Sequence, residues 1–92
     1  MIVRILEEGQ WELADEELAG LNELDDALEA AVAAGDEPAF ARSMAALLDA
    51  VRSKGTPLPA DALHDSDLIL PPADATLEEV RDLLSDEGLI PG

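Results

Sequence analysis

The chain contains no cysteine and no tyrosine, and it has one tryptophan, one phenylalanine and one histidine among its 92 residues. The absence of cysteine excludes a disulfide framework, a thiolate zinc site and a cysteine nucleophile. Hydrophobic runs are also short, because none approaches the roughly 18 residues that a membrane-spanning helix needs. The first residues lack the charged and then apolar layout of a signal peptide. We therefore expect a cytoplasmic protein without disulfides.

Basic residues are scarce, with five Lys and Arg against 22 Asp and Glu, and the formal net charge is −17. Between Ile5 and Ala41 there are twelve acidic residues and no Lys or Arg. Such a surface repels nucleic acids and anionic lipids, so we expect neither nucleic-acid binding nor direct membrane binding. The general interpretation of this charge is solubility, including solubility in a high-salt cytosol. The more specific interpretation is an acidic face for a basic partner.

Residues 15–54 have the pattern of two amphipathic helices joined at Gly35 and Asp36. Asp15 and Asp36 are predicted to cap the two helices with their carboxylates, and Gly35 suits the left-handed residue that follows a helix end. We expect antiparallel helices near 15–34 and 37–54. Apolar residues recur at steps of three and four, and those predicted to meet between the helices are Leu21, Leu24, Leu28, Leu47, Leu48 and Val51.

The flanking segments predict a small sheet and a third helix. Residues 2–13 alternate around Gly9 in the manner of a β-hairpin, and we expect Trp11 to pack into the core. The extended stretch near 67–70, which precedes Pro71, is a candidate third strand. Thr76 and Glu79 have the spacing of a capping box, which predicts a helix near 76–86 that ends before Gly88.

Together these elements predict an α+β fold that is mainly α. Its parts are an antiparallel helical hairpin, a third helix and a small N-terminal β-hairpin with a candidate third strand. Ninety-two residues with one modest apolar core make a single domain, residues 1–92.

Catalytic and ligand-binding motifs are scarce. His64 lies two residues from Ser66, which by itself does not establish a triad, and we expect a surface-loop histidine. The acidic pairs lack the glycine that a calcium loop requires. The segment from Asp65 to Leu68 is similar to the attachment motif of acyl carrier proteins, which carry phosphopantetheine on the serine of an Asp-Ser-Leu sequence, but Asp67 interrupts it. We expect no enzyme activity, no catalytic residues, no cofactor and no metal, and we keep an acidic carrier-type domain or an unrelated acidic adaptor as alternatives.

Seven segments in order resemble the PspA-associated protein family, PspAA. They are MIVRIL at 1–6, GQW at 9–11, LNELD at 21–25, GTPLP at 55–59, SDLILPP at 66–72, TLEEV at 76–80 and GLIP at 88–91. The resemblance covers nearly the whole chain. It implies a three-helix domain encoded beside phage-shock protein A, the coiled-coil membrane-stress protein.

The same resemblance implies a non-enzymatic interaction or regulatory module of the phage-shock response to envelope stress. Its partner would be a helical protein like phage-shock protein A, through which the domain would lie at the membrane periphery. The family supplies no established ligand residues. From the charge pattern alone, the candidate partner-binding residues are Glu23, Asp25, Asp26 and Glu29. Self-association stays open at this stage.

Overall fold

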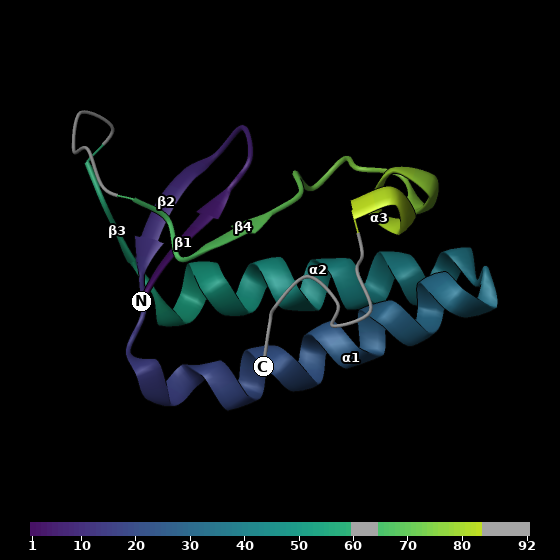
Figure 1. Cartoon of the computed structure of the whole chain (residues 1–92), viewed down its shortest axis with the longest axis horizontal. Helices are drawn as coiled ribbons and strands as arrows, with labels where there is room; N and C mark the ends of the chain where they lie inside the picture. Colours follow the sequence, from purple (N-terminus) through teal and green to yellow (C-terminus); the bar gives the residue numbers. More distant parts are fainter. Residues whose placement is uncertain (60–64, 84–92) are drawn as a thin grey trace.

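The computed structural model describes residues 1–59 and 65–83, which form a helical hairpin with a small sheet and a short helix on one side (Figure 1). The long helices are α1, Leu18–Ala34, and α2, Glu37–Lys54. The strands are β1, Ile2–Ile5; β2, Gly9–Glu12; β3, Thr56–Pro57; and β4, Leu68–Leu70. A 3₁₀ turn, η1, covers Asp15–Glu17, and α3 covers Leu77–Leu83. The predicted α+β, mainly α fold class is confirmed.

The turn between the long helices has the predicted chemistry. Gly35 adopts a left-handed φ of 67° at the end of α1, a conformation that costs glycine little. The Oδ1 of Asp36 accepts a hydrogen bond of 3.1 Å from the backbone N–H of Ala39. At the start of α3, Thr76 and Glu79 form the capping box, each accepting a 3.1 Å bond from the other's N–H. The predicted end of that helix, near Gly88, lies outside the described residues.

The predicted cap at Asp15 is wrong. Residues 15–17 form the 3₁₀ turn η1, which is preceded by Ala14 and has no side-chain cap. The α-helical hydrogen bonding starts at Leu18, three residues later than the sequence pattern predicts. A tight turn redirects the chain from the sheet into α1, so the carboxylate of Asp15 is not placed over free N–H groups of the α-helix.

The sheet has the strand order β3-β2-β1-β4. The hairpin is antiparallel, with Val3 opposite Trp11, whereas β4 pairs with β1 in parallel, with Val3 opposite Leu68. The candidate strand near 67–70 is therefore confirmed. The two-residue β3 extends the sheet beyond β2, although Thr56 and Pro57 predict only the end of a helix.

One core joins the sheet to all three helices. Of the six residues predicted to meet across the hairpin, five are buried and Leu24 is half-buried. Trp11 is also half-buried and packs against this core, which agrees with its predicted position. The other buried apolar residues of this core are Val3, Ile5, Leu13, Ala31, Val32, Phe40, Met44, Leu68, Leu70, Leu77 and Val80.

Gly55 lies where β2 comes close to the end of α2. A methyl group added to it would lie 2.7 Å from the carbonyl oxygen of Val51 and 2.9 Å from the Cβ of Trp11. We expect Gly55→Ala to lower the free energy of unfolding by about 1–3 kcal/mol, because a backbone must shift to accommodate it. Denaturant unfolding followed by circular dichroism measures this change.

Gly20 supplies the matched control within α1. A methyl group there meets nothing within 4 Å, and alanine is favoured over glycine in a helix by roughly 0.5–1 kcal/mol. We expect Gly20→Ala to raise the free energy of unfolding. Equal effects of the two substitutions would contradict the close approach at Gly55.

Candidate interaction surface

The four acidic residues predicted to bind a partner do not share one surface. Glu23 and Asp26 are exposed on α1, and Glu29 is partly exposed. Asp25 is buried, with 1 % of its surface exposed, and it makes a polar interaction within the protein. The structure therefore places Asp25 in the interior and not on the solvent-facing surface where a partner would bind. Asp25 lies four residues after Leu21 and three before Leu28, so helical periodicity places it on the core face.

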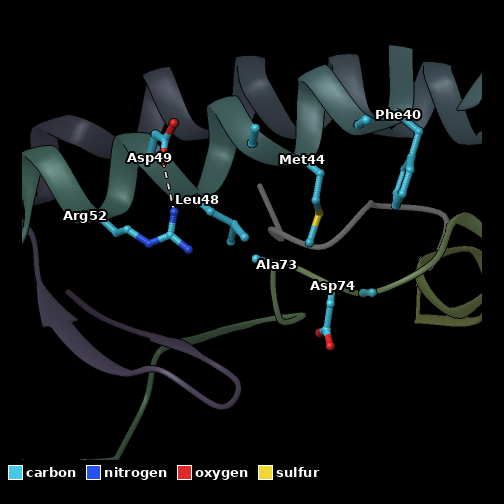
Figure 2. Close-up of a pocket in the computed structure, with 10 residues that line it drawn as sticks. Phe40, Met44, Leu48, Asp49, Arg52, Ala73 and Asp74 are labelled. Atoms are coloured by element: carbon cyan, nitrogen blue, oxygen red, sulfur yellow. Dashed lines mark hydrogen bonds and ion pairs between the residues drawn. The ribbon is translucent and has the colours of Figure 1, made fainter. Parts of the chain in front are cut away.

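A groove of about 270 Å³ lies between α2 and the loop that leads from β4 to α3 (Figure 2). The side chains of Phe40, Met44 and Leu48 point into it from α2, and Ala73 and Asp74 stand on the opposite side. The other described residues that line it are Ala41, Ala45, Asp49, Arg52 and Ala75. The groove thus has an apolar floor, small residues on both sides and charged groups near its edges.

Arg52 joins α2 to the turn of the β-hairpin. Its Nε donates a 2.8 Å hydrogen bond to Glu8 Oε1, its Nη2 contacts Glu8 Oε2, and its Nη1 donates a 2.9 Å bond to Asp49. The hydrogen bonds from Arg52 lower the pKa of the Glu8 carboxyl. This pair therefore stabilises the fold above the ordinary pKa of a glutamate, and its contribution is lost as pH falls through the lowered pKa.

A second hollow, of about 230 Å³, lies against the same loop as the groove. The two share Ala73 and Asp74, and the second is also lined by Leu6, Glu7, Glu8 and Pro72. Leu6 is an apolar residue with 39 % of its surface exposed. The groove and this hollow together are called the α2 groove below. Among the described residues of its lining, the acids are Glu7, Glu8, Asp49 and Asp74, and the one base is Arg52.

The segment similar to a carrier motif, residues 65–68, leads into β4. Ser66 precedes β4 and its hydroxyl oxygen accepts a 2.8 Å hydrogen bond from Gln10. Asp67 binds Ile2 twice, since its Oδ2 accepts from the Ile2 N–H at 2.7 Å and its own N–H donates to the Ile2 carbonyl at 2.8 Å. These contacts fix the start of β4 beside β1. His64 lies outside the described residues.

Within residues 1–59 and 65–83, no group of three His, Cys, Asp or Glu side chains is placed to hold a metal ion. In the same part of the chain, no helix is long and apolar enough to cross a membrane.

A comparison of the sequence with protein-family profiles identifies the family of this chain. The sequence profile of the family described as PspA-associated protein matches residues 1–92. The chain belongs to the PspA-associated protein family. No curated protein and no solved structure shows a significant match. For this member of the family, the α2 groove and the exposed acids of α1 are the surfaces compared below.

The α2 groove is not predicted by the sequence of this PspA-associated protein. Phe40, Met44 and Leu48 follow helical core spacing and are buried, and the hollow beside them depends on the tertiary position of residues 73–75. The sequence holds one partial signal. Ala41 and Ala45 lie beside the row, and both are exposed, so the helix presents small side chains where larger ones would fill the space.

Proposed function

We propose that this chain is a non-enzymatic, cytoplasmic partner of a coiled-coil protein like phage-shock protein A, and that it takes part in the envelope-stress response through that complex. The observation that carries the proposal is the family match over residues 1–92, since the family is described by its association with PspA. The protein would reach the membrane periphery only through its partner.

The charge distribution supports a protein partner over the other classes. A formal net charge of −17 opposes binding to nucleic acids and anionic lipids. On the described surface, Glu7, Glu8, Glu23, Asp26 and Asp74 are exposed. Such a surface accelerates encounter with a partner that carries basic residues.

The contacts of Ser66 also weigh against a carrier function. Its side chain is partly buried, and its oxygen accepts the bond from Gln10 next to a strand. Attachment of a prosthetic group would replace that contact and disturb the start of β4. A binding module needs no such change.

Calorimetry with the purified phage-shock protein A-like protein of the same cell tests the proposal. We expect a saturable complex at tens of micromolar protein, with weaker binding as salt screens the acidic surface. Co-purification from the native cell followed by mass spectrometry is the matching measurement in vivo. If neither low nor physiological salt gives a complex, direct binding is wrong and the acidic-adaptor alternative replaces it.

A further inference from the structure

The shape of the α2 groove suits an elongated apolar ligand. Its floor follows α2 from Phe40 to Arg52, which corresponds to about 18 Å, or roughly three helical turns. Ala41, Ala45 and Ala73, which also line the groove, have small side chains that leave space above that floor. A helix that docks in such a groove inserts side chains at intervals of three and four residues.

The charges around the groove favour a ligand of one sign of charge. Arg52 is engaged by both Glu8 and Asp49, so its positive charge is already compensated. Glu7 and Asp74 are exposed acids on the same lining, with the Asp74 carboxylate turned away from α2 at the edge of the groove (Figure 2), and neither has an ion-pair partner among the described residues. The groove therefore favours a ligand with basic residues beside its apolar ones.

The same charges disfavour a second copy of this chain as the occupant. Two copies would bring together surfaces that each belong to a chain of net charge −17, and like charges at an interface oppose association. From the apolar floor and the acidic rim, we infer that the α2 groove is the docking site for a basic amphipathic helix of the coiled-coil partner, an inference that rests on the proposed function.

A bulky side chain placed in the lining of the α2 groove tests the groove as the docking site. Ala45 lines the groove, whereas the next residue, Ala46, is exposed on α2 but is not part of the lining. We expect Ala45→Trp to weaken binding to the phage-shock protein A-like protein by about tenfold or more, and Ala46→Trp to leave it within about twofold. Circular dichroism should give both variants the melting temperature of the parent, because both alanines are exposed.

Charge reversal distinguishes binding in the groove from binding by the acids of α1. Asp74 lies in the groove lining, and Asp26 is exposed on α1 outside it. We expect Asp74→Lys to lower the affinity about threefold to tenfold at low salt and Asp26→Lys to change it less than twofold. The reverse order of effects would assign binding to α1 and overturn the groove as the docking site.

A synthetic peptide tests the groove as a docking site independently of the proposed function. The probe is an 18-residue helical peptide of leucine and lysine, with leucine at intervals of three and four. Because any cationic peptide is attracted to so acidic a chain, its affinity alone decides nothing, and the comparison of Ala45→Trp with Ala46→Trp is the readout. We expect only Ala45→Trp to weaken peptide binding.

The combined outcomes are distinct. If the phage-shock protein A-like protein binds equally to the parent, Ala45→Trp and Asp74→Lys, the proposed function stands and the groove is wrong. If the peptide binds in the groove but the protein does not bind at all, the proposed function falls and the groove remains a site for basic helices. If neither ligand distinguishes Ala45→Trp from Ala46→Trp, the inference is overturned.

Discussion

Replacing Asp25 with lysine is expected to lower the free energy of unfolding by at least about 3 kcal/mol. The side chain is 1 % exposed and makes a polar interaction within the protein. The substitution removes that interaction and places a longer cation on the core face of α1, between Leu21 and Leu28. Because small domains have only about 5–15 kcal/mol of stability, the loss is large. Denaturant unfolding measured by circular dichroism checks it.

Asp26 is the control for this substitution, because it is the next residue of α1 and is exposed. Asp26→Lys should change the free energy of unfolding by no more than about 0.5 kcal/mol. If Asp25→Lys and Asp26→Lys unfolded at the same denaturant concentration, the expected cost of placing a lysine at the buried position 25 would be contradicted. A loss of partner binding in Asp25→Lys should therefore be attributed to unfolding, even though its neighbours Glu23 and Asp26 are suited to test a binding surface.

Truncating Leu47 or Leu28 to alanine should lower the free energy of unfolding by about 2–5 kcal/mol. Both side chains are fully buried, one in each long helix. Each substitution removes apolar contacts and leaves a cavity that the packed helices close only in part. Thermal unfolding would show this as a large fall in the melting temperature.

Leu83→Ala is the control, because it makes the same leucine-to-alanine change at an exposed position. Leu83 lies in α3, and 55 % of its surface is exposed. We expect Leu83→Ala to cost less than about 1 kcal/mol. The assignment of the core to the α1–α2 contact would be contradicted if Leu47→Ala and Leu28→Ala melted with the parent while Leu83→Ala did not.

Local chemistry made much of the backbone predictable. The bounds of α2 follow from Asp36, which caps its start, and from Gly55, which ends it. The start of α3 follows from the reciprocal bonds of Thr76 and Glu79. In each case the deciding interaction lies within four residues of the boundary, so the sequence alone contains it.

Features that depend on distant parts of the chain were not predictable in this way. The spacing of Asp25 from Leu21 and Leu28 indicates the core face, whereas its charge is typical of a surface residue, and the packing of the whole fold decides that it is buried. The strand β3 exists because β2 offers it a partner, and the α2 groove exists because the loop before α3 passes beside α2. The same limit applies to the proposed docking site, since helical periodicity assigns Phe40 and Met44 to the core, where they are buried, without showing that the loop before α3 leaves a groove beside them.

The parallel pairing of β1 with β4 also bears on how the newly made chain folds. Asp67, which fixes the start of β4, follows Ile2 by 65 positions, a delay of about 3 to 13 s at ribosomal speeds of roughly 5–20 residues per second. During that interval the edge of β1 that later receives β4 stays open, and an open edge invites pairing between chains. The acids Glu7 and Glu8 in the turn and Glu12 in β2 belong to this hairpin, and their negative charges oppose such pairing between neighbouring chains.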